Sequence, residues 1–60
     1  MTSQRLNQIM QERYSYITYD SLLAEEYLKV GAPITDDEET IAWCFVDYLT
    51  SQGLAEDVVL

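Results

Sequence analysis

Carboxylates are the side chains of this sequence whose number and spacing point to a chemical role, and they gather in one half of it. Residues 31–60 carry seven acidic side chains and no basic one, whereas residues 1–29 are nearly balanced in charge. The seven acids are Asp36, Asp37, Glu38, Glu39, Asp47, Glu56 and Asp57. A surface of one sign attracts cationic partners and repels nucleic acid and anionic membranes. The pattern therefore indicates binding to a basic partner.

The same carboxylates do not fit a catalytic or metal-binding pattern. The sequence has no histidine and no glycine-rich phosphate loop. Paired carboxylates perform acid–base chemistry in a buried cleft, which so short a chain can hardly supply. The run from Asp36 to Glu39 also lacks the alternating ligands and central glycine of a calcium loop. We predict no enzymatic activity, no cofactor and no metal site.

Length and composition indicate one small folded domain over residues 1–60. A chain of 60 residues buries only about 60% of its unfolded surface, so a monomer is marginally stable. The 48% hydrophobic content is too high for an intrinsically disordered chain. Cys44 is the only cysteine, so no disulfide within the chain can staple the fold. Added stability is expected from a homodimer or from docking on a partner.

The sequence also predicts where the protein acts. Its first residues contain no apolar stretch that resembles a signal peptide. The longest apolar run, residues 41–46, is far too short to span a membrane. A single cysteine suits a reducing compartment. These features predict a cytoplasmic protein, in a cell or in an infected host, without membrane contact.

Hydrophobic periodicity predicts an all-α fold, a small three-helix domain with a short C-terminal tail. The expected helices cover residues 3–17, 20–30 and 36–52. Thr2 or Ser3 is the expected N-cap of the first helix. The aromatic and β-branched residues 14–19 leave the end of that helix open. Three of the tyrosines, Tyr14, Tyr27 and Tyr48, fit the predicted core. Tyr16 and Tyr19 are less constrained by the core pattern.

Capping signals define the other two helices. Gly31 suits the C-cap of the second helix, and Pro33 prevents its continuation. Thr35 and Glu38 have the spacing of a capping box at the start of the third. Gly53 is placed for a left-handed C-cap, which Leu54 would accompany with a hydrophobic contact. The apolar end of the tail, residues 58–60, is expected to pack against the domain.

The acidic run at the start of the third helix has two interpretations. Carboxylates in a first helical turn complement the helix dipole, at roughly 0.3–1 kcal/mol each, so Asp36 to Glu39 serve partly as helix stabilisers. Asp47 in the middle of the helix and Glu56 and Asp57 beyond its end have no such explanation. These three acids favour a binding role for the acidic half.

A helical wheel places Trp43 among the acids. Trp43 lies about 200° from Ile41, on the side of Asp36, Glu39 and Asp47. A large aromatic ring surrounded by charge is typical of a binding hot spot. The alternative is that the C-terminal tail or a dimer partner covers Trp43. Both interpretations predict a tryptophan that is not freely exposed.

The second and third helices also admit a helix-turn-helix interpretation, which the charges oppose. The supposed recognition helix would bring Asp36 to Glu39 against DNA phosphates, where a DNA-binding protein presents neutral or basic groups. No basic residue follows Lys29. Direct binding of nucleic acid is therefore excluded on electrostatic grounds.

These observations predict a non-enzymatic protein-binding module, an inhibitor or regulator of a partner with a basic surface. In size and acidity the chain is similar to the short acidic inhibitors of phages and mobile elements. That resemblance implies mimicry of nucleic acid, with carboxylates where phosphates would sit. The predicted partner-binding residues are Trp43 as anchor and Asp36, Asp37, Glu39, Asp47, Glu56 and Asp57 as charges.

Two other functions fit the same sequence. One is a small homodimeric structural or adaptor protein, whose acidity mainly provides solubility. Its dimer contacts would be Leu22, Ala42, Trp43 and Val46. The other is an antitoxin-like protein that neutralises a basic toxin by the same electrostatics.

Overall fold

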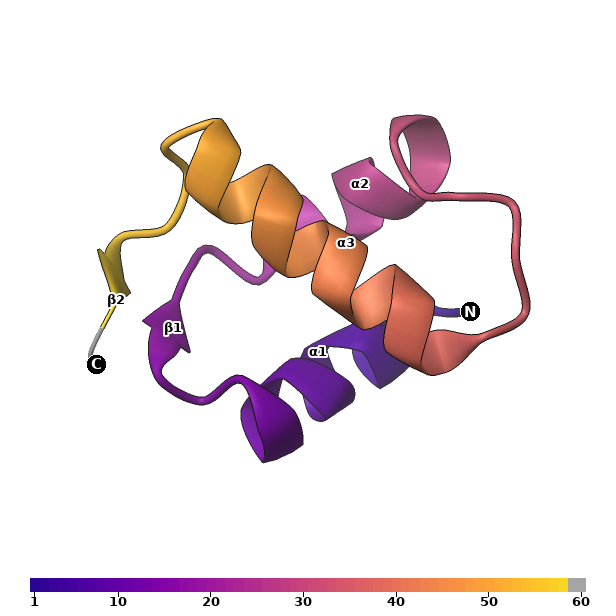
Figure 1. Ribbon diagram of the computed structural model, residues 1–60, viewed down its shortest axis with the longest axis horizontal. Helices are drawn as coiled ribbons and strands as arrows, with labels where there is room; N and C mark the ends of the chain where they lie inside the picture. Colours follow the sequence, from indigo (N-terminus) through magenta and orange to yellow (C-terminus); the bar gives the residue numbers. More distant parts are fainter. Residues whose placement is uncertain (59–60) are drawn as a thin grey trace.

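Three α-helices and one pair of short strands make up the computed structural model, which describes residues 1–58 (Figure 1). In chain order the elements are α1 (Ser3–Arg13), β1 (Ile17–Thr18), α2 (Leu22–Val30), α3 (Glu38–Ser51) and β2 (Asp57–Val58). The predicted small three-helix domain is confirmed. Each helix is shorter than expected, because its predicted ends belong to turns, caps and a strand.

The first helix ends four residues earlier than predicted. Its start agrees with the sequence, since the Thr2 hydroxyl accepts a hydrogen bond from the amide of Arg5 at 3.1 Å. After Arg13 the chain turns, with the amide of Ile17 donating to the carbonyl of Tyr14 at 3.0 Å. Aromatic and β-branched side chains favour extended backbone over helix, and here that preference wins.

The C-terminal segment pairs with β1, where a tail without regular structure was predicted. The strands are antiparallel, with Ile17 opposite Val58 and Thr18 opposite Asp57. The amide of Glu56 extends the pairing by donating to the carbonyl of Thr18 at 2.7 Å. Buried Ile17 attaches β1 to the core. The last two residues of the predicted docking segment, Val59 and Leu60, lie outside the described residues.

Helix α2 begins and ends with local hydrogen bonds. The Asp20 carboxylate accepts from the amide of Leu22 at 3.0 Å, and Gly31 is the C-cap, as the sequence predicted. Gly31 does not adopt the left-handed conformation usual for a glycine at a helix end, because its φ is −126° and its ψ is −12°. The reason for glycine at this position must therefore be spatial rather than conformational.

The two ends of α3 test the capping predictions separately. The predicted capping box is wrong: Asp37 is the N-cap, and its carboxylate accepts from the Glu39 amide at 3.2 Å and the Thr40 hydroxyl at 2.7 Å. The Thr35 hydroxyl instead accepts from the Asp37 amide at 3.2 Å. The C-terminal prediction is confirmed. Gly53 has a φ of 70°, and the amide of Leu54 donates to the carbonyl of Leu49 at 2.8 Å.

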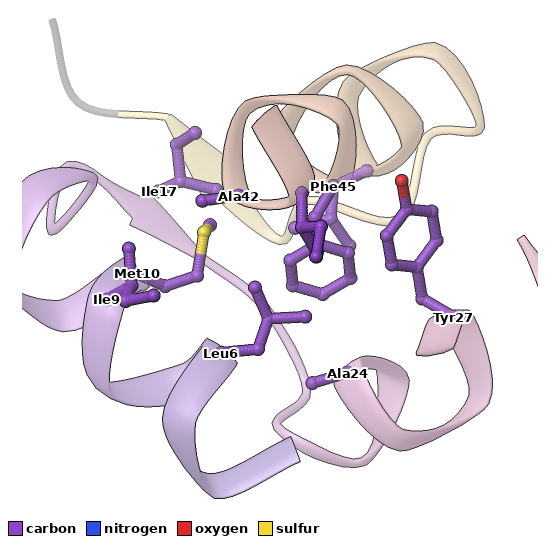
Figure 2. Packing of buried hydrophobic residues seen from close by; sticks show 10 residues of the cluster. Leu6, Ile9, Met10, Ile17, Ala24, Tyr27, Ala42 and Phe45 are labelled. Carbon is purple, nitrogen blue, oxygen red and sulfur yellow. The ribbon is translucent and has the colours of Figure 1, made fainter. Parts of the chain in front are cut away.

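Phe45 lies at the centre of the hydrophobic core, with contributions from all three helices and β1 (Figure 2). Its ring meets Tyr19 edge to face at a centroid distance of 5.3 Å, and the Tyr27 ring lies 5.0 Å away. Tyr27 is buried as predicted, and Tyr14 and Tyr48 are half-buried. The buried residues are Leu6, Ile9, Met10, Ile17, Ala24, Tyr27, Ile41, Ala42, Phe45 and Leu49.

Asn7 joins α1 to the connection between β1 and α2. Its side-chain amide donates to the carbonyl of Ser21 at 3.2 Å, and its oxygen accepts from the Tyr19 hydroxyl. Tyr19, predicted to be among the freer tyrosines, is thereby fixed against the core, and burial raises the pKa of its hydroxyl. Tyr16, the other, is 42% exposed.

Candidate protein-binding face

Two of the clustered carboxylates hold α1 against α3. The Arg5 guanidinium donates to both oxygens of Glu38, from Nε at 2.9 Å and from Nη2 at 3.1 Å. Arg13 forms an ion pair with Glu39, whose carboxylate also accepts from the Tyr14 hydroxyl at 3.3 Å. Glu39, predicted to bind a partner, is therefore already engaged within the fold. Its negative charge is offset by a cation of the same chain.

The hydrogen bonds from Arg5 change the protonation behaviour of both members of the pair. They lower the pKa of Glu38 from its ordinary value, since they stabilise the ionised carboxylate. The same hydrogen bonding raises the pKa of Arg5. Both groups are well exposed to solvent, so the bridge fixes geometry more than it adds stability.

Asp37 and Asp36 have different roles at the start of α3. Asp37 uses both carboxylate oxygens as the N-cap, so the stabilising interpretation of the acidic run applies to it directly. Asp36 is exposed and lines a small hollow together with Met1, Thr35, Glu38 and Ile41. Of the four clustered acids, Asp36 is therefore the one without a defined structural partner among the described residues.

Trp43 is more exposed than the sequence analysis predicted. It stands one helical turn after Glu39 and one turn before Asp47, so these three side chains share a face of α3. The Trp43 side chain keeps 54% of its surface exposed. The described tail, as far as Val58, pairs with β1. An exposed indole between two carboxylates is the most distinctive feature of this face.

Asp47 borders a groove that the sequence did not reveal. The groove runs between the C-terminal parts of α2 and α3, and Asp47 lies on its rim. The residues that line it are Tyr27, Gly31, Pro33, Cys44, Asp47, Tyr48 and Ser51. A helical spacing places four of these residues on one face of α3, namely Cys44, Asp47, Tyr48 and Ser51. The α2 side of the groove depends on tertiary packing, which the sequence does not show.

The seven acids do not form a single cluster. Asp36 to Glu39 lie at the N-terminal end of α3, whereas Glu56 and Asp57 follow its C-terminal end, beside β1 (Figure 1). Fourteen helical residues separate these groups by about 21 Å along the axis. Glu56 is exposed. The acids therefore lie at both ends of α3, and Trp43 and Asp47 lie on the helix between them; we call these residues the acidic band of α3.

All three basic side chains are used within the fold. Arg5 and Arg13 pair with the first two residues of α3, and Lys29 pairs with Glu25 one turn earlier on α2 at 3.3 Å. The net charge is −8. No cation of the chain pairs with Asp36, Asp47 or Glu56 within the described part. Folding thus leaves the α3 band negative.

Within residues 1–58, no helix is long and apolar enough to cross a membrane, and no group of three or more metal-ligating side chains converges. A scan against protein-family models, a search of curated proteins and a search of solved structures each returned no match. The reasoning about function therefore depends on the residues themselves.

Proposed function

We propose that this protein is a non-enzymatic module that binds a partner protein with a basic surface through the acidic band of α3. The observation that carries the proposal is Trp43, which is 54% exposed between Glu39 and Asp47. A soluble chain that only needed charge for solubility has no reason to expose its sole tryptophan there.

The acids and the indole contribute to binding in different ways. Rim carboxylates such as Asp36, Asp47 and Glu56 attract a basic surface and orient it during encounter. A tryptophan that is desolvated on binding supplies much of the affinity, as aromatic hot spots do. Nucleic-acid-binding proteins present the basic surface that this band fits. Inhibition of such a protein by carboxylates in its phosphate sites, in the cytoplasm of a cell or infected host, is the form of the function we favour.

Affinity capture at two salt concentrations tests this function. The immobilised chain is exposed to host lysate, and a basic protein is expected to bind at low salt and to elute at high salt, because exposed charges are screened within about 10 Å at 0.1 M. Trp43→Ala should abolish most of the capture, and Asp36→Asn should weaken it. Glu26→Gln removes one negative charge from α2 and is the matched control. Capture of only acidic or neutral proteins, or capture unaffected by salt, refutes the proposal.

A homodimeric adaptor is the second candidate, and exposed apolar side chains favour it. Leu22, Val30 and Ile34 are 70%, 82% and 106% exposed, respectively. Ala42 does not take part as predicted, because it is fully buried. Light scattering over a dilution series separates the two functions. A tight dimer broken by Trp43→Ala favours the adaptor, whereas an unchanged monomer that loses its partner favours the binding module.

A further inference from the structure

The groove between α2 and α3 combines aromatic walls with one carboxylate. The rings of Tyr27 and Tyr48 lie 5.0 Å apart at an interplanar angle of 36°. Tyr27 forms a buried wall and Tyr48 is half-buried. Aromatic rings carry negative charge on their faces and attract cations placed over them. Asp47 adds a full negative charge at the rim.

Gly31 lies closely against the edge of the Tyr27 ring. Its backbone angles are open to other residues, so no left-handed conformation requires glycine here. A Cβ atom at this position would lie 3.1 Å from Cδ1 of Tyr27 and 3.3 Å from Cε1. A side chain here would crowd the ring, which is only 3% exposed. The glycine therefore preserves space against an aromatic surface.

Asp47 is electrostatically coupled to this aromatic wall. Burial raises the pKa of Tyr27, and the negative charges of Cys44 and Asp47 raise it further. Asp47 and Tyr27 also line the same groove. No arginine or lysine of the described chain pairs with Asp47. The groove thus offers negative potential that the fold leaves uncompensated.

We infer that this groove receives one arginine side chain of the basic partner, with its guanidinium against the half-buried Tyr48 ring and paired to Asp47. Arginine fits better than lysine because its planar group stacks on aromatic rings and pairs with carboxylates through two hydrogen bonds. This inference rests on the proposed function and adds the residue type that the acidic band selects. Asp47 is central to it, since it belongs both to the Trp43 face and to the groove.

A blocked Gly-Arg-Gly peptide is the direct probe, titrated into the protein at low salt and followed by NMR. The ring signals of Tyr27 and Tyr48 should shift on binding. Replacement of arginine by citrulline, which has the same shape without charge, should abolish the shifts. Asp47→Asn should weaken the affinity about fivefold, the effect of a well-placed surface ion pair. Tyr48→Leu should weaken it about as much through loss of the cation–π contact.

Two controls separate this inference from folding defects and from general acidity. Glu26→Gln removes the same charge outside the groove, and it should change the affinity less than about twofold. Thermal unfolding of each variant checks that the domain stays folded. Equal effects of Asp47→Asn and Glu26→Gln, or equal binding of the citrulline peptide, overturn the inference. Tighter binding of a Gly-Lys-Gly peptide overturns the assignment to arginine.

The outcome also distinguishes the groove from the proposed function as a whole. If lysate yields a salt-sensitive basic partner whose binding needs Trp43 and is insensitive to Asp47→Asn, the groove inference fails and the function stands. If the arginine peptide binds the groove and no basic protein is ever captured, the proposed function fails instead.

Discussion

Replacement of Phe45 by alanine should remove much of the stability of the domain. The side chain is fully buried and its ring lies close to the rings of Tyr19, Tyr27 and Tyr48. A buried Phe→Ala change costs about 3–5 kcal/mol, from lost burial and from the cavity that remains. At about 0.05–0.15 kcal/mol per residue, a domain of 60 residues has on the order of 3–9 kcal/mol in all. The change should therefore remove at least about a third of the stability, and all of it if the domain lies at the lower end of that range.

Trp43→Ala is the internal comparison, because it changes an aromatic residue only two positions away. Less than half of the Trp43 side chain is covered. A fully buried tryptophan covers up to about 250 Å². At about 25 cal/mol per Å², the covered part is worth at most about 3 kcal/mol, and alanine returns some of this through its helix propensity. Trp43→Ala should thus lower the free energy of unfolding less than Phe45→Ala does.

Urea unfolding followed by far-UV circular dichroism measures both variants on the same scale. Phe45→Leu, which keeps an apolar side chain, provides a folded variant if Phe45→Ala does not fold. We expect Phe45→Ala to be the least stable of the three variants. A cost for Phe45→Ala below about 1 kcal/mol, or a larger cost for Trp43→Ala, would mean that α3 faces the core with the opposite side.

Three further predictions concern caps and bridges. The pKa of Glu38 is lowered from its ordinary value of about 4.5, so its ion pair with Arg5 stabilises the fold above that pH and is lost as the pH falls through the folded-state pKa. Glu38→Gln should therefore reduce the fall in melting temperature that acid causes. A pH profile of the melting temperature that is unchanged in this variant refutes the bridge. Gly53→Ala should cost about 1 kcal/mol in urea unfolding because its φ is 70°, and a stabilising effect contradicts the left-handed cap. Asn7→Ala should lower the free energy of unfolding by about 1–2 kcal/mol, and by more than Tyr19→Phe, because it also leaves the Ser21 carbonyl without its partner. Equal effects of the two variants in urea unfolding argue against the hydrogen bond from Asn7 to Ser21.

Local sequence signals predicted those parts of the fold that local interactions determine. Thr2, one of the two N-caps predicted for α1, and the Gly53 cap are both confirmed, because each depends on residues within one turn. The prediction of Thr35 as N-cap failed for a related reason. Asp37 offers the same chemistry two residues later, and its carboxylate can accept two hydrogen bonds at once. Sequence spacing alone does not rank two competing caps.

Tertiary contacts decided the features that the sequence analysis missed. Nothing in residues 17–18 or 57–58 alone indicates that they pair, since each segment is too short to show strand periodicity. The ion pairs of Arg5 and Arg13 with Glu38 and Glu39 join residues that lie more than 20 positions apart. The first half of the sequence looks balanced in charge, but in the fold two of its three basic side chains pair with acids of the second half.

This pairing changes how the acidity should be understood. In the linear sequence, the run from Asp36 to Glu39 looks like the centre of the acidic site. In the fold, two of its members bind arginines and a third is a cap, so the run contributes less to a partner surface than its density suggests. Asp47, an isolated acid in the sequence, instead lies beside an exposed tryptophan and an aromatic groove. A test that neutralised the whole run would also remove two ion pairs and the N-cap of α3, whereas Asp47→Asn tests the proposed recognition and leaves those contacts in place.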